Sequence, residues 1–471
     1  MPLSRAFIRS RSLPAVAILP GLSQTTTKTR AVPGVLLLYH RPLFGDAATI
    51  DEHIEAFGRH SHFPVRALNT DFGFPRGLAG TSYDAIVLHY SVFASGPFDY
   101  LIGAGFLDFI DRSPDSYKVA FFQDEHQHCQ RRFAFLDRHR IDCVYTCFER
   151  RYFDQTYGHY TQVPKLVSHV PAYVSDDMVA AAERLHVPDA ERTIDIGYRA
   201  RPMPPYVGRG GLEKVEIGER FAELAAGGEL SIDISTREED RLYGEEWYRF
   251  VAASRGFLGT ESGVSCSDLE DEVREEYERL SADGRKVTID ELERGALGRW
   301  DWKVPLRTTS SRHFEAAALR VCQIMFEGEY SGALRPMEHY IPLRKDFSNY
   351  DEVIERWSDP SLRRELTENA HRDLIASGKH SYERFIASFD QTLREAGLQP
   401  PGEGAQQALA GPVLRSRPPR ALASRYIGGV WDWLQRTHPA LWRVLHYASR
   451  PVVWPAKRIL RVASRGDAQP S

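Results

Sequence analysis

Polar and acidic side chains that could bind a ligand are concentrated in one segment, from Ser311 to Tyr340. A short polar turn leads into a helix of small residues that carries Glu315, and an apolar strand at 321–326 follows. A carboxylate near a helix start, facing a cleft, can accept hydrogen bonds from both hydroxyls of a ribose, and the N–H groups of that helix start can bind a diphosphate. The alternative is an acid that only complements the helix dipole. Spacing alone leaves both interpretations of Glu315 open.

The surrounding elements predict an α/β fold built twice along the chain. In the first unit we expect strands at 35–39, 65–68, 85–89, 118–122 and 143–146, and helices at 49–59 and 97–111. In the second unit we expect strands at 193–198, 230–234, 257–258 and 321–326, and helices at 214–226, 245–254 and 312–319. Continuous apolar runs indicate strands buried on both faces, so the sheets should be parallel, and such sheets bind ligands beyond the carboxyl ends of their strands. The prediction is two Rossmann-like lobes that face a cleft.

Composition excludes several classes of protein. Of the 471 residues, 42% are hydrophobic and 26% charged, which is typical of globular domains and excludes disorder as the main state. The net charge of −4 argues against a nucleic-acid binder. Five cysteines do not make a disulfide framework and suit a reducing compartment. Since no apolar run approaches the ~18 residues of a membrane-spanning helix, we expect a cytoplasmic protein that is neither a channel nor a transporter.

Shifts in composition divide the chain. Residues 1–33 predict a disordered basic leader, because prolines interrupt the apolar stretch that a signal peptide would need. We expect an N-terminal lobe at 34–185 and a C-terminal lobe at 186–395. The charged residues 265–306 break the alternation and form an insertion, either a lid or a solvated excursion. Residues 396–420, rich in Pro, Gly, Ala and Gln, indicate a linker.

The last segment, 421–471, is a basic tail with several tryptophans. From Arg415 to Arg465 there are eleven Lys or Arg residues and one acid. Basic residues interleaved with Trp and Leu favour a helix on a membrane surface, here through 421–462. Packing on the main body, or a site for nucleic acid or another partner, are the alternatives. We expect no nucleic-acid partner and a location at the inner face of the membrane.

Residues 311–345 resemble the second lobe of GT-B glycosyltransferases, particularly the retaining family-four type and CgeB-like relatives. The shared pattern is the polar turn, a Glu on a helix of small residues, a strand, an acidic Gly-containing loop at 327–330 and a return through 339–343. The resemblance covers roughly 34–395, although the first lobe matches only in layout. It implies the GT-B fold and Glu315 as the ligand of the donor ribose. It also implies transfer of a sugar, with retention, from a nucleotide-diphosphate donor to a glycan or lipid-linked acceptor.

The resemblance also implies further donor-binding residues. The family places Arg and Lys after the first strand of the second lobe, where this chain has Arg199, Arg201, Arg209 and Lys214. The acidic loop is expected to contact the donor through Glu327, Gly328, Glu329 and Tyr330. Family-four enzymes carry a second Glu eight positions before the ribose ligand, where this chain has Arg307. Glu261, which ends an earlier strand, is the candidate to replace it.

On the first lobe, retaining relatives often carry a His at the end of the strand that here covers 118–122. His126 fits that position, or His128 by a small shift, and we predict that His126 and Glu315 are catalytic. After the first strand, His40, Arg41 and Asp46 could meet the acceptor.

Several motifs are missing from the sequence. His126, His128, Cys129, Cys143 and Cys147 lie close together but give no C-x-x-C pair, so we predict buried thiols rather than a metal site. Asp-x-Asp, which the GT-A class uses to hold a divalent ion, is absent. We therefore expect no metal and no resident cofactor, with Arg, Lys and helix dipoles neutralising the leaving diphosphate. Two alternatives remain: another sugar-nucleotide enzyme such as an epimerase, and a non-catalytic GT-B-like scaffold.

Overall fold

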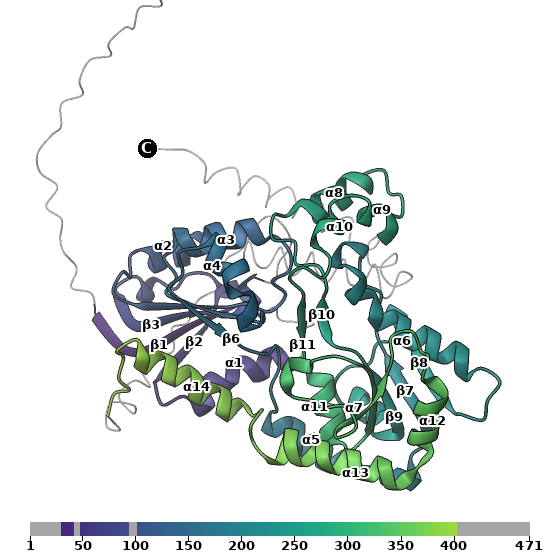
Figure 1. Cartoon of the computed structure of the whole chain (residues 1–471). Coiled ribbons are helices and arrows are strands. Elements are labelled where there is room, and N and C mark those ends of the chain that lie inside the picture. The colour runs from purple at the N-terminus through teal and green to yellow at the C-terminus, as the bar shows by residue number, and fades with distance from the viewer. Residues whose placement is uncertain (1–29, 42–47, 94–100, 403–471) are drawn as a thin grey trace, which may run out of the picture.

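The computed structural model describes residues 30–41, 48–93 and 101–402, which form two α/β lobes (Figure 1). The first lobe has a six-stranded parallel sheet in the order β2-β1-β3-β4-β5-β6. Its strands are β1 (Arg30–Tyr39), β2 (Val65–Asn69), β3 (Thr81–Leu88), β4 (Tyr117–Phe121), β5 (Cys143–Thr146) and β6 (Lys165–Ser168). Its helices are α1 (Ala48–His60), α2 (Ala104–Asp111), α3 (Cys129–Arg138) and α4 (Tyr157–Tyr160).

The second lobe has a five-stranded parallel sheet in the order β13-β12-β9-β7-β8. Its strands are β7 (Ile194–Arg199), β8 (Ile232–Ser235), β9 (Ser254–Gly259), β12 (Cys322–Phe326) and β13 (Tyr340–Leu343). Its helices are α5 (Asp176–Leu185), α6 (Arg209–Ala225), α7 (Gly244–Ala253), α11 (Ser311–Ala318), α12 (Tyr350–Ser358) and α13 (Pro360–Ala370). Strand order reverses at β7 and β9, the kind of switch point where open sheets bind ligands.

The two-lobed α/β architecture expected from the sequence is therefore confirmed. Element boundaries differ in places. β1 begins at Arg30, so the expected leader ends before residue 33. β6 was not predicted, because it has four residues and none of them is fully buried. α3 was also missed, because its mostly polar sequence hides the apolar face that Phe133 and Leu136 bury.

The C-terminal part of the expected second lobe crosses back to the first lobe. α14 (Tyr382–Glu395) lies along α1 beneath the first sheet (Figure 1). The ring of Phe389 meets that of Phe57 at 5.1 Å between centroids, and Asp390 accepts hydrogen bonds from Ser61 Oγ (2.6 Å) and His62 N (2.7 Å). The assignment of residues up to 395 to the second lobe was wrong, because an amphipathic pattern shows that a helix buries one face but not which sheet it covers.

The insertion at 265–306 is folded and reaches both lobes. The antiparallel strands β10 (Ser262–Val264) and β11 (Leu306–Thr308) flank it and lie between the lobes (Figure 1). Its helices α8 (Glu272–Leu280), α9 (Ile289–Glu293) and α10 (Leu297–Trp300) enclose a small core around Val273 and Leu292. A merely solvated excursion is thus excluded for this segment.

Other expectations fall outside the described residues: Asp46, most of the linker and the whole basic tail at 421–471. Within the described part of the chain, none of the helices combines the length and apolar character that crossing a membrane requires.

Replacing Phe389 by Ala should destabilise the first lobe. The ring is fully buried between α14 and the first sheet, so its loss should lower the free energy of unfolding by about 3–5 kcal/mol. Urea denaturation measures this change, with Tyr243→Ala at an exposed position as the control. Equal midpoints for the two variants would contradict the packing of α14 described above.

Candidate active site

A cleft of about 580 Å³ opens between the lobes at the carboxyl ends of β4, β7 and β9. From the first lobe it is lined by Asp124, His126 and Gln127. From the second lobe it is lined by residues after β7 and β9, by Lys214 of α6 and by the start of α11, including Arg201, Tyr206, Thr260, Ser311, Arg312 and His313. Loops from two separate sheets thus meet around one space.

Three cations face this cleft: Lys214, Arg201 and Arg312. No carboxylate in the described part of the chain forms an ion pair with any of them. Burial, followed by the nearby guanidinium groups of Arg312 and Arg307, lowers the pKa of Lys214 to about 8, and Asp124 only partly opposes this. A cluster of this kind is stabilised by an anion, because a negative charge would compensate all three groups.

The start of α11 adds to this positive field. Ser311 is the first residue of the helix and lies at the cleft. Of the N–H groups in this first turn, that of His313 donates to Ser310 O (3.2 Å). The Arg312 guanidinium lies 5.1 Å from the centre of the Trp247 ring and donates a hydrogen bond to Arg199 O (2.7 Å). A helix start beside fixed cations is a favourable position for phosphate groups.

His126 faces these cations from the first lobe. Burial lowers the pKa of its imidazole to about 4, so the ring is neutral near pH 7. Its Nδ1 is buried and has no hydrogen-bond partner among the residues that the structure describes. The preceding residue, Glu125, holds the loop from below, accepting hydrogen bonds from Thr146 Oγ1 (2.8 Å), Cys147 N (2.5 Å) and the Tyr157 hydroxyl. A neutral imidazole in this position can exchange a hydrogen bond with a ligand.

Of the residues predicted to touch the ligand, His126, Arg201 and Lys214 line the cleft. His128 does not; it precedes α3 in a left-handed conformation. Asp124 and Arg312 also line the cleft and were not singled out from the sequence. Both could have been found in the sequence, since Asp124 lies three residues after the end of β4 and Arg312 lies in the first turn of α11, before Glu315.

Two of the predicted phosphate ligands are engaged elsewhere, and their expected place in the cleft was wrong. Arg199 pairs with Asp233 (2.7 Å) and lies over the Phe250 ring. Arg209 pairs with Glu293 (2.5 Å) and Asp290 (3.0 Å) of α9. The sequence could not show this, because the acids come from β8 and from the insertion.

Glu315 does not line the cleft either, which corrects the expected orientation. Its buried carboxylate accepts a hydrogen bond from Trp247 Nε1 at 2.6 Å. Burial raises its pKa, and the bonds from Trp247 and Ser311 with the charge of Arg312 oppose that rise. Contact with a ribose would require this carboxylate to leave the indole, so its role at the donor stays a prediction.

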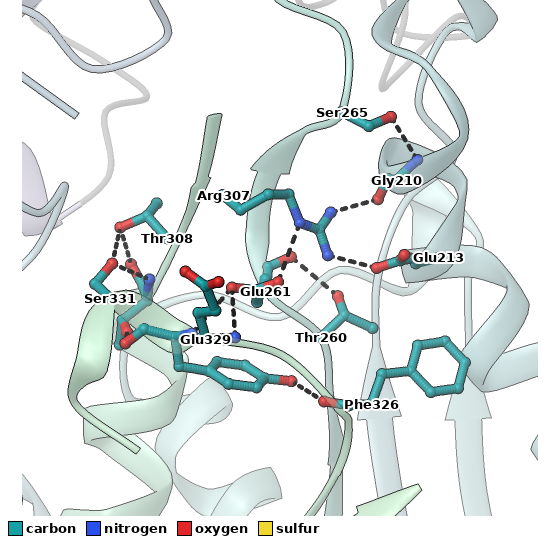
Figure 2. Close-up of polar contacts among 12 residues, drawn as sticks. Gly210, Glu213, Thr260, Glu261, Ser265, Arg307, Thr308, Phe326, Glu329 and Ser331 are labelled. Carbon is teal, nitrogen blue, oxygen red and sulfur yellow. Dashed lines mark hydrogen bonds and ion pairs between the residues drawn. The ribbon is translucent and has the colours of Figure 1, made fainter. Parts of the chain in front are cut away.

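Glu261 belongs to a buried network of charges (Figure 2). Its Oε1 accepts hydrogen bonds from the backbone N–H groups of Tyr330 (2.9 Å) and Glu329 (3.2 Å), and Arg307 Nε donates to its Oε2 at 3.3 Å. Arg307 also pairs with Glu213, whose other oxygen is 2.7 Å from Lys345 Nζ. Glu261 thus joins the 327–330 loop to β11 and α6, and it is not in the cleft lining.

The 327–330 loop braces the fold and does not line the cleft, which corrects the expected donor contact. Gly328 lets Glu261 approach, since a Cβ there would lie 2.8 Å from the Glu261 carboxyl carbon. Glu329 pairs with Arg151 of the first lobe (2.5 Å), and the Tyr330 hydroxyl donates to Phe326 O (2.6 Å). Glu327 donates its N–H to Leu343 O (3.1 Å).

The predicted acceptor residues also lie away from the cleft lining. His40 donates its backbone N–H to Ser91 Oγ (3.0 Å), and the Arg41 side chain pairs with Asp51. Since Asp46 is outside the described residues, this prediction stays without support from the geometry.

One group could in principle hold a metal ion, formed by Glu338, His339 and Asp373. His339 Nδ1 accepts the N–H of Arg335 (3.1 Å), so Nε2 carries the proton and faces Asp373 Oδ2 at 3.1 Å. Arg372 and the other cations around Asp373 hold its pKa well below the usual range. Arginines thus already compensate the charge of this group. The five cysteines are free and buried, as predicted.

Comparisons with known proteins were made for the whole chain. A scan against models of protein families finds no match, and a search of curated proteins finds none either. Among solved structures, the chain is similar to an alpha-glucosyltransferase in complex with UDP-glucose and DNA containing an abasic site (12% identity, 77% of this chain and 99% of that chain, TM-score 0.46). It is also similar to sucrose-phosphate synthase from Thermosynechococcus elongatus (12% identity, 78% and 99%, TM-score 0.43) and to a glycosyltransferase from Rickettsia africae ESF-5 (10% identity, 78% and 98%, TM-score 0.42). These TM-scores are low, so the matches do not bear on what this chain binds or transfers.

Replacing Arg307 by Met should be strongly destabilising. The change leaves Glu261 buried without a cation and removes one of the two cations at Glu213, which should lower the free energy of unfolding by about 3–5 kcal/mol. Adding Glu213→Gln and Glu261→Gln to the same chain should recover part of the loss, because the uncompensated charges are then gone. Chemical denaturation checks both effects, with Arg237→Met in the exposed Arg237–Asp240 pair as the control. A loss no larger than that of the control would contradict the network.

Proposed function

We propose that this protein is a glycosyltransferase that moves a sugar from a nucleotide-diphosphate donor to an acceptor bound across the cleft. The observation that carries this proposal is the set of three cations without acidic partners beside the start of α11, at the switch point of the second sheet. A diphosphate matches this set in charge, and the cleft between the lobes has room for the nucleoside and sugar on either side.

In this proposal the cations act on the leaving group. When the bond between the sugar and the diphosphate breaks, negative charge grows on the departing phosphate oxygen. Lys214, Arg201 and Arg312 line the cleft, so their positive charges face that position and would stabilise the growing negative charge. Neutralisation by side chains, without a divalent ion, is part of the proposal.

The first lobe contributes to the sugar and the acceptor. His126 and Asp124 face the cations across the cleft, and a sugar held between the lobes would lie within their reach. Holding donor and acceptor in one cleft makes their encounter effectively intramolecular. Retention at the anomeric carbon, and a cell-envelope or lipid-linked acceptor at the cytoplasmic face of a membrane, follow from the resemblance and the basic tail and belong to the proposal.

A panel of nucleotide-diphosphate sugars tests this function. Calorimetry should find at least one donor that binds, and chromatography should detect the nucleoside diphosphate released from it. Lys214→Met should weaken that binding at least tenfold, because one charge-assisted contact to the diphosphate is lost. Lys379→Met, at an exposed lysine of the second lobe, is the matched control. Failure of the wild-type protein to bind any donor would favour the non-catalytic scaffold, and product formed from donor without acceptor would favour an epimerase.

Donor binding should also weaken with rising pH. In the protein without donor, the pKa of Lys214 is about 8, and this side chain must be protonated to pair with the diphosphate. The affinity for the donor is therefore highest below that pH and falls as the pH rises through it. Binding at about pH 7 and about pH 9 should therefore differ several-fold for the wild type. Lys214→Arg, which stays charged over this range, should remove the difference. The same pH dependence in that variant would show that another group is responsible.

A further inference from the structure

Helix α3 of the first lobe begins without a cap of its own. The residue before it, His128, has a left-handed backbone (φ 54°) and gives no side-chain hydrogen bond to the helix. The cap comes from the insertion of the second lobe: Asp271 Oδ1 accepts the N–H of Cys129 at 2.8 Å, and Oδ2 accepts that of Gln130 at 3.2 Å. A helix in one lobe is therefore completed by a carboxylate from the other.

Further contacts join the segment before α3 to residues 268–274 of the insertion. The N–H of Asp268 donates to the carbonyl oxygen of His126 itself (3.0 Å). Gln130 Nε2 donates to Leu269 O (2.8 Å), and the Leu269 side chain is buried among first-lobe residues. Arg274 donates to the side-chain oxygen of Gln127. The insertion thus holds the segment 126–130, which includes the only cleft histidine of the first lobe among the described residues.

The other end of the insertion is fixed to the second lobe in a similar way. Asp301 Oδ2 accepts the N–H of Arg209 (3.2 Å), and Ser265 Oγ accepts that of Gly210 (2.7 Å), so the start of α6 is capped. Gly208 (φ 82°) precedes this start, and a Cβ there would lie 2.3 Å from Asp301 Oδ1. Since α6 carries Lys214, one insertion caps a helix in each lobe and joins the two lobes.

We propose that residues 265–306 are an interlobe latch, with Asp271 as a positioning residue that sets His126 against the donor; this rests on the proposed function. Asp271 is itself left-handed (φ 61°), a conformation that Asp adopts more readily than most other non-glycine residues. Without the Asp271 carboxylate, the first turn of α3 loses its cap, the His128 turn relaxes and His126 moves.

Loss of the latch should affect turnover and donor affinity differently. The donor cations belong to the second lobe, whereas the latch fixes a first-lobe group. Asp271→Ala should therefore leave the affinity for the donor within about twofold while turnover falls about tenfold or more, because a misplaced group acts on the chemical step. Asp271→Asn should restore part of the turnover, because its amide oxygen can still accept the N–H of Cys129 and Asn tolerates the left-handed region, although its NH2 group cannot accept the N–H of Gln130.

The experiment compares wild type, Asp271→Ala, Asp271→Asn and the control Glu275→Ala, an exposed acid on α8. Hydrogen exchange of the 129–138 peptide, measured without ligand, should be faster in Asp271→Ala alone. Donor affinity and turnover are then measured with the donor found in the panel. Exchange in Asp271→Ala equal to that of the control, or a loss of affinity as large as the loss of turnover, would overturn the latch. If the wild type binds no donor, the proposed function fails, while hydrogen exchange still decides whether the latch exists.

Discussion

Positive charge without an ion-pair partner is the constraint around which this cleft is built. Lys214 is half-buried, whereas Arg201 and Arg312 are exposed, so the cost of unpaired charge is largest at Lys214, whose pKa burial lowers. The carboxylates that could do so are engaged elsewhere in the described chain: Glu125 with Thr146 and Tyr157, Glu213 and Glu261 with Arg307, and Glu315 with Trp247. None of these acids forms an ion pair with Lys214, Arg201 or Arg312, and the charge of Asp124 at the cleft only partly opposes the lowered pKa of Lys214. A diphosphate would supply the missing charge, which is why these residues support a binding role better than a structural one.

Arg307 shows the opposite arrangement, a buried cation whose charge is fully compensated. It lies on β11, eight residues before Glu315. With a cation there, Glu261 becomes an ion-pair partner and cannot also serve a ligand. Its second oxygen then accepts the N–H groups of the 328–330 turn and orders that loop. Both oxygens of Glu261 are therefore used within the fold, one toward Arg307 and one toward the 327–330 loop.

The sequence predicted what depends on local pattern. Continuous apolar runs identified both sheets, and the segments that follow β4 and β7 include His126, Arg201 and Lys214, which line the cleft. The sequence-based prediction failed where a side chain binds a residue that is distant in the sequence. Glu315 lies where the pattern places it, on a short helix at the switch point, but Trp247, 68 residues away, holds its carboxylate. Arg209 and Arg199 form ion pairs with acids whose distance along the chain follows no recognisable pattern. The sequence also did not show that α14 packs on the first lobe, because only the folded structure shows which sheet face its apolar side covers.

The distribution of groups between the lobes leads to one further step. The cations that would hold the donor belong to the second lobe, and His126 belongs to the first, so any chemistry that needs both depends on how the lobes are oriented. Elsewhere the junction includes weak links such as the exposed Arg151–Glu329 pair, which contributes little in water. The insertion contributes more, because Leu269 and β10–β11 extend the apolar core of the first lobe, and because caps on α3 and α6 fix direction as well as distance. An insertion that only extended into solvent would need neither the apolar contacts nor the helix caps. The charged residues of 265–306 suggested a peripheral segment in the sequence. Some of their carboxylates instead cap helices of the two lobes and so join the two sides of the cleft.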